Sequence, residues 1–159
     1  MRLLTAATVA VAATLAVAGT TNTWAAENPQ PDLEVSRNGE TVAIRTALVT
    51  DGGNNSVKLF FSSATPTCKE ILAPMRVRAA GEVSFELTRN TSSGGRFQWM
   101  AYYNGNTAPA SDGSEFVVQI DPTRGATSTG TIKARLEGVR EGDELQVGGT
   151  FKAIGCGSK

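Results

Sequence analysis

Apolar and polar residues alternate at every second position over most of the chain after residue 32. This is the period of a β-strand with one buried face. In "TGTIKARLEG", for example, Ile132, Ala134 and Leu136 alternate with charged residues. The same period recurs in five further segments, whose apolar positions are Val42, Ile44, Thr46 and Leu48; Val57, Leu59 and Phe61; Val83, Phe85 and Leu87; Phe116, Val118 and Ile120; and Leu145, Val147, Phe151 and Ala153.

Turns rich in Gly, Asn, Asp and Pro separate these segments, and a helical period is nearly absent. One irregular connector, "SATPTCKEILAPM", has room for a single helical turn around "CKEIL". About eight short strands with this spacing are typical of two packed antiparallel sheets. The pattern therefore predicts an all-β fold, an antiparallel β-sandwich, over residues 33–157.

The first residues have a different composition. Arg2 precedes an apolar run that ends near Gly19, and small residues surround Ala25. A basic start, a short apolar stretch and a small-residue cut site predict a secretory signal peptide over residues 1–25. The run is short and rich in alanine for a permanent membrane span of roughly 20 residues. We expect a flexible leader over residues 26–32, no membrane span after cleavage, and a periplasmic or secreted protein.

The charge balance bears on the partners. The chain has 15 basic and 15 acidic residues, so removal of Arg2 with the signal peptide leaves 14 basic against 15 acidic residues. No basic block occurs, and binding to nucleic acid depends on clustered Lys and Arg. The sequence therefore predicts no nucleic-acid partner.

Two cysteines, Cys68 and Cys156, are the only ones in the chain. In an oxidising compartment an even pair predicts a disulfide, which here would contribute roughly 4–5 kcal/mol by restricting the unfolded chain. The alternative is a redox or metal-binding pair. The spacing is not C-x-x-C, and two thiolates without histidine make a poor zinc site.

Histidine is absent from the chain, which excludes Ser–His–Asp and Cys–His catalysis and the usual histidine metal sites. No nucleotide-binding or nucleophile-elbow motif occurs. Carboxylate-pair catalysis stays open in principle. "DGGNN", "SDGSE" and "REGDE" offer oxygen ligands for calcium, but they match ordinary turns better than a calcium loop. We expect no enzyme activity, no cofactor and no metal.

The aromatic segment "RFQWMAYYN" is the candidate binding surface. Alternation directs one face of it to the core, so the other face is exposed. Tyr, Met and Arg are enriched at protein interfaces. The exposed set comprises Arg96, Gln98, Met100, Tyr102 and Asn104. We expect a non-catalytic protein-interaction module at the cell envelope. The alternatives are a carbohydrate-binding module using Trp99 and a secreted protease inhibitor using a loop such as "NGNTAPASDG".

The strand "VKLFFSS" leading into "TPTC", and the closing "ELQVGGTFKAIGC", together resemble small exported two-cysteine β-sandwich proteins of bacteria. The resemblance covers about residues 57–156. It implies the fold, a disulfide and an extracytoplasmic location, and it carries no catalytic residues.

Overall fold

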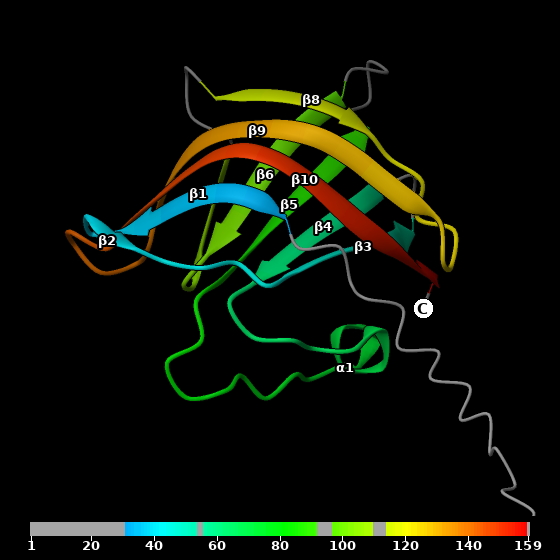
Figure 1. Cartoon of the computed structure of the whole chain (residues 1–159), viewed down its shortest axis with the longest axis horizontal. Coiled ribbons are helices and arrows are strands. Elements are labelled where there is room, and N and C mark those ends of the chain that lie inside the picture. Colours follow the sequence, from blue (N-terminus) through cyan, green and yellow to red (C-terminus); the bar gives the residue numbers. More distant parts are fainter. Residues whose placement is uncertain (1–30, 54–55, 92–96, 110–113, 159) are drawn as a thin grey trace, which may run out of the picture.

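A computed structural model describes residues 31–53, 56–91, 97–109 and 114–158. The described elements are almost entirely β-strands, which confirms the predicted all-β class (Figure 1). They are β1 (Asp32–Arg37), β2 (Glu40–Thr41), β3 (Thr46–Gly53), β4 (Ser56–Ser62), α1 (Cys68–Leu72), β5 (Ser84–Thr91), β6 (Phe97–Tyr103), β7 (Asn106–Pro109), β8 (Glu115–Gln119), β9 (Thr127–Glu137) and β10 (Glu144–Ser158).

The strands form one ten-stranded sheet instead of the predicted two packed antiparallel sheets. Eight of the strands follow the order β2-β1-β10-β3-β4-β5-β6-β7. The remaining two are β9, which pairs with β10, and β8, which pairs with β9. Strand β10 is 15 residues long, which allows it to pair with β1, β3 and β9. One edge pairs antiparallel with β1 over its first half and parallel with β3 near its end, while β9 pairs along its opposite edge.

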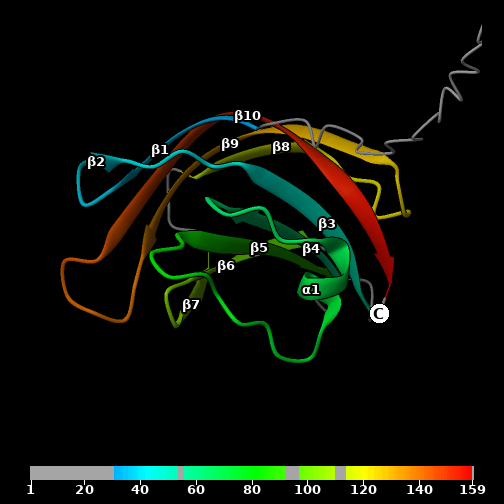
Figure 2. The same cartoon turned by 60° about the horizontal axis from the view of Figure 1, so that its bottom comes forward.

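The sheet curls into a half-barrel, in which β1, β8, β9 and β10 arch over β4, β5 and β6 (Figures 1 and 2). The concave face encloses the core. Phe61 lies at its centre, with ring centroids 4.7 Å from Phe85 and 5.4 Å from Phe151. The inward positions of β9 and β10 are the predicted ones, including Leu136 and Val147. Alternation in the sequence therefore assigned the buried face of these two strands correctly. In β3 the prediction was wrong: it placed Thr46 and Leu48 on the core face, whereas the core contains Ala47 and Val49, because residues 42–45 form no strand and interrupt the two-residue period.

Trp99 on β6 stacks on Phe116 of β8, with ring centroids 5.3 Å apart. No backbone pairing between β6 and β8 is found among the described strands, so side chains pack across this part of the open side of the half-barrel. Trp99 therefore lies on the face of β6 opposite the predicted exposed residue Met100, in agreement with the alternation of this segment.

The disulfide predicted between Cys68 and Cys156 is present and ties α1 to the end of β10. Strand β10 changes register near this point, between Gly155 and Ser158, where it pairs with β3. On the convex face of the sheet, Leu48 and Phe60 are buried without belonging to the main core. The end of β10 pairs beside Leu48, so the disulfide and these apolar side chains lie on the same region of the sheet.

The predicted signal peptide and most of the predicted leader lie outside the described residues. Pro31 is already buried and β1 begins at Asp32, so the last residues of the predicted leader belong to the folded domain. Within the part of the chain that the structure describes, no helix has the length and apolar content to cross a bilayer.

Candidate functional site

The predicted aromatic surface is only partly open. Met100 and Tyr102 are half-buried on the convex face of β6, with Tyr102 opposite Glu86 on one side and Thr107 on the other. Asn104 lies in the turn to β7, and its side-chain amide donates a hydrogen bond to Asp143. Arg96 and the side chain of Gln98 lie outside the described residues. The structure therefore brings Met100 and Tyr102 together on one face and turns Asn104 towards another element; their binding role stays a prediction.

Asp143, in the turn before β10, is a buried acceptor that joins three parts of the sheet. Its carboxylate accepts hydrogen bonds from Tyr103 Oη at 2.9 Å and Arg37 Nε at 3.1 Å, as well as from Asn104. Burial alone would raise the pKa of Asp143, but these hydrogen bonds lower it below its ordinary value. Burial, together with the hydrogen bond to Asp143, raises the pKa of Tyr103 to about 12.

The carboxylate of Asp143 in the "REGDE" turn is satisfied by the hydrogen bonds that it accepts from protein donors. Within the described residues, no group of three or more His, Cys, Asp or Glu side chains gathers as metal ligands do. In the "DGGNN" turn, the Asp51 carboxylate accepts from the backbone N–H of Gly53 at 2.9 Å, which is an ordinary use of aspartate in a turn. We therefore assign both aspartates to the fold.

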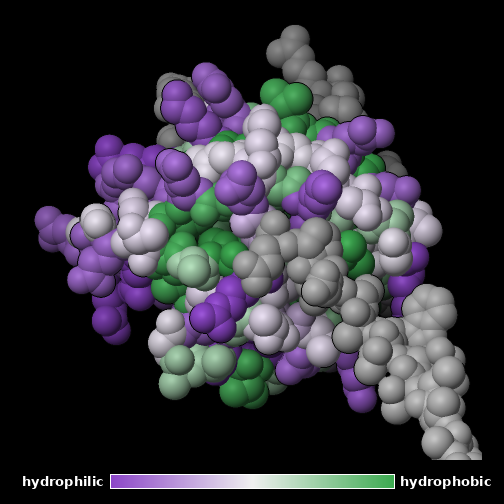
Figure 3. Space-filling view, viewed as in Figure 1, coloured by the Kyte–Doolittle hydropathy of each residue, from purple (hydrophilic) through white to green (hydrophobic). Residues whose placement is uncertain are grey.

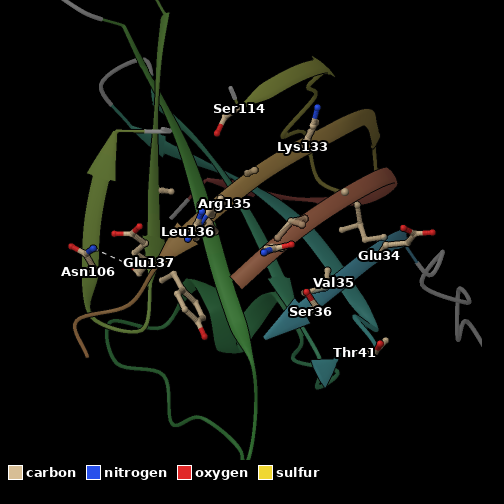
Figure 4. A pocket seen from close by; sticks show the side chains of 17 residues that line it. Glu34, Val35, Ser36, Thr41, Asn106, Ser114, Lys133, Arg135, Leu136 and Glu137 are labelled. Carbon is tan, nitrogen blue, oxygen red and sulfur yellow. Dashed lines mark hydrogen bonds between the residues drawn. The ribbon is translucent and has the colours of Figure 1, made fainter. Parts of the chain in front are cut away.

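A hollow of about 1230 Å³ lies on the open side of the half-barrel. Figure 4 shows Asn106 and Glu137 on one side of it and Val35, Ser36 and Thr41 on the other. This volume exceeds that of a typical small-molecule pocket, roughly 300–1,000 Å³. Two apolar residues of its floor are almost fully covered, since Val35 is 2 % exposed and Leu136 is 3 % exposed, whereas Leu33 is partly exposed. The hollow is therefore an open depression whose accessible lining is both polar and apolar.

The charges around the hollow do not favour one sign of ligand. Glu34 and Glu137 balance Lys133 and Arg135 among the lining residues. Arg135 also forms an ion pair with Glu144. The hollow therefore lacks the focused charge that would concentrate a charged ligand.

The most distinctive exposed feature is residues 73–82, which we call the arm. The arm belongs to the connection between β4 and β5, residues 63–83, although these two strands are hydrogen-bonded neighbours. Antiparallel neighbours need only about 2–5 loop residues, and connections longer than about 12–15 residues are usually functional or disordered. Figures 1 and 2 show the arm leaving α1 and projecting from the sheet before it returns to β5.

Two apolar side chains on the arm face solvent. Met75 is 89 % exposed and Val77 is 93 % exposed, and Arg78 beside them is also exposed. Figure 3 shows green, apolar atoms along the lower margin of the molecule, where Figure 1 places the arm. Exposed apolar side chains that do not pack against their own domain are candidates for contact with a partner.

The arm is nevertheless fixed to the sheet through Glu82. This carboxylate is fully buried and accepts hydrogen bonds from Ser62 Oγ at 2.5 Å, Arg76 Nη2 at 2.6 Å and the backbone N–H of Ala79 at 3.0 Å. We call these four residues the Glu82 clamp. Burial alone would raise the pKa of Glu82, but the three hydrogen bonds outweigh it and lower the pKa below its ordinary value.

Local sequence also orders the start of the arm. Thr67 and Glu70 form a capping box at α1, in which Thr67 Oγ1 accepts from the backbone N–H of Glu70, and the Glu70 carboxylate accepts from the backbone N–H of Thr67. The disulfide of Cys68 begins the same helix. Sequence reasoning predicted an irregular connector with a single helical turn around "CKEIL", and α1 confirms that turn. The spacing of Arg76 and Glu82 was visible, but nothing local indicated that Ser62 would meet them.

Comparison with known proteins adds no functional information: no protein-family model, curated protein or solved structure matches the chain.

Proposed function

We propose that this chain is a non-catalytic binding protein of the extracytoplasmic space that engages a protein partner through its arm. The observation that carries the proposal is the exposure of Met75 and Val77 on a segment that the Glu82 clamp fixes to the fold. Exposed apolar side chains on a flexible loop would lose conformational entropy on binding, whereas a fixed segment has already lost it on folding. The disulfide is compatible with an oxidising location.

The carbohydrate-binding alternative has weaker support. Trp99 is partly buried and stacks on Phe116, so that one ring face is already used inside the protein. A sugar-binding platform requires an accessible aromatic face. The side-chain contacts of Trp99 therefore favour a packing role.

The test is a comparative pull-down with three immobilised proteins, read by mass spectrometry from envelope and culture fractions. They are the wild type, an arm variant (Met75→Asp with Val77→Asp) and a control (Val117→Asp with Val139→Asp). Val117 is 73 % and Val139 is 68 % exposed, so the control changes similar side chains elsewhere. We expect a partner that the wild type and the control retain and the arm variant loses. Equal recovery by all three, or no partner at all, would contradict the proposal.

A further inference from the structure

The two oxygens of the Glu82 carboxylate reach opposite sides of one peptide bond in the arm. Oε1 accepts from the Arg76 guanidinium, which precedes Val77, and Oε2 accepts from the backbone N–H of Ala79, which follows Arg78. Ala79 also accepts a hydrogen bond from the backbone N–H of Glu82 through its carbonyl oxygen, at 3.1 Å. One buried group therefore holds both flanks of the Val77–Arg78 bond while Val77 and Arg78 themselves face solvent.

The sheet supports this arrangement from below. The Arg76 guanidinium lies over the ring of Phe60, 4.9 Å from its centroid, and Phe60 is 4 % exposed. Ser62, which donates to Glu82, is on the same strand and is fully buried. Arg76 thus points towards β4, whereas the neighbouring Met75 and Val77 are exposed. Among residues 74–80 of the arm, Arg76 alone is half-buried and the other residues are exposed.

Residues 76–79 form neither helix nor turn, and the arm projects from the body (Figure 2). A projecting segment with outward side chains fits a concave cleft that takes a substrate chain and has pockets for single side chains. Endopeptidases bind substrates in such clefts, and the primary pocket selects one side chain by size and charge. Protease–inhibitor complexes are tight at standard interface size and form with little backbone movement, which a fixed segment permits.

We propose that the arm docks like a substrate in the cleft of a serine endopeptidase of the elastase type, with Val77 in the small aliphatic primary pocket. The inference rests on the proposed function and names the class of its partner. Val77 is chosen because it is the most exposed large apolar side chain among the described residues and precedes the bond that the Glu82 clamp flanks. Its short branched side chain suits a small pocket, while a long basic one would not.

The clamp also explains why such docking inhibits the enzyme instead of consuming the protein. Hydrolysis of the Val77–Arg78 bond adds one water and yields a carboxylate on Val77 and an ammonium group on Arg78. Arg76 and Ala79 would still be held by Glu82, so the new ends stay close together. Rejoining them expels the same water. A flexible loop would separate after cleavage and release the enzyme.

The experiment is an inhibition assay with the full chain against elastase-, chymotrypsin- and trypsin-type serine endopeptidases. We expect stoichiometric inhibition of the elastase type that competes with substrate. Val77→Asp should weaken it at least ~100-fold, since a charge enters an apolar pocket. Val77→Phe should transfer inhibition to the chymotrypsin type. Val117→Asp is the matched control and should change nothing.

A second variant tests the clamp independently of the pocket. Glu82→Gln keeps the size of the side chain, and we expect weaker inhibition together with faster cleavage at Val77–Arg78, measured by mass spectrometry. Thermal unfolding of each variant checks that the fold is kept. Inhibition of the trypsin type that depends on Arg78 would overturn the assignment of Val77. Absence of inhibition with arm-dependent capture of another partner would overturn this inference alone, and absence of both would overturn the proposed function too.

Discussion

Replacing Glu82 by alanine removes the one acceptor that connects the arm to the sheet. The carboxylate receives three hydrogen bonds, and bonds to charged groups contribute about 1.5–3 kcal/mol each when they are desolvated. The three donors differ in what happens after the substitution. The Arg76 side chain is 16 % exposed and the backbone of Ala79 lies in an exposed segment, so water replaces their lost partner.

Ser62 is fully buried, and its hydroxyl loses its acceptor in this variant. An unsatisfied buried donor costs about 1–3 kcal/mol. The relief of burying a charge offsets part of the total. We therefore expect Glu82→Ala to lower the free energy of unfolding by about 2–3 kcal/mol, and Glu82→Gln, which keeps one acceptor, by about 1–2 kcal/mol.

The assay is chemical denaturation of the oxidised protein at neutral pH, with Glu115→Ala on the exposed side of β8 as a control expected to change little. The loss should be accompanied by faster proteolysis within residues 73–82. A Glu82→Ala variant with wild-type stability and an equally protected arm would refute the reasoning, because the clamp would then hold nothing.

The same carboxylate gives the protein an acid-sensitive element. Its folded pKa is lower than its ordinary value, so the stability it contributes is complete above the unfolded pKa of about 4.5 and is lost as the pH falls through the lower folded value. We expect the stability difference between wild type and Glu82→Ala to shrink over this acidic range. A difference that stays constant down to the lowest pH at which the protein folds would contradict the prediction.

Three further changes test the remaining structure. Reducing the Cys68–Cys156 disulfide should cost about 4–5 kcal/mol by the chain-entropy relation, measured as a shift of the denaturation midpoint; an unchanged midpoint would contradict it. Asp143→Asn should lower the pKa of Tyr103 from about 12 towards 10, seen in the ultraviolet absorbance of tyrosinate, because a neutral amide no longer disfavours the phenolate; a pKa that stays near 12 would assign the shift to burial alone. Gly155→Ala should destabilise by about 1–3 kcal/mol, since its Cβ would overlap a neighbouring backbone carbonyl oxygen; wild-type stability in urea would count against this packing.

Alternation in the sequence was sufficient to predict the buried faces of β4, β5, β9 and β10, because side-chain direction within a strand follows the local period. It failed in β3, where Leu48 was expected in the core, because residues 42–45 interrupt that period. Ile132, Leu136 and Val147 are buried as expected. Strand pairing has no comparable local signal. Leu48 pairs in parallel with Ile154 across more than half of the chain, and this pairing replaces the predicted two sheets with one.

The same limit applies to the candidate site. Sequence reasoning favoured Met100 and Tyr102 because they alternate with core residues, and both are half-buried. The arm has no period and appears only as a connector in the sequence. Its order comes from Ser62, 20 residues before Glu82, and from a contact that forms only when β4 and β5 pair. A segment fixed by one distant buried group is therefore the kind of feature that local patterns miss.

If the Glu82 clamp displays residues 75–78 as a fixed segment, backbone amide relaxation of the wild-type protein measures this rigidity directly. We predict order parameters at Met75, Val77 and Arg78 close to about 0.85, the value of a rigid backbone. The control is Glu82→Ala, in which the same amides should become more mobile. Order parameters below about 0.6 in the wild type would contradict the claim, since the arm would then be flexible despite its hydrogen bonds to Glu82.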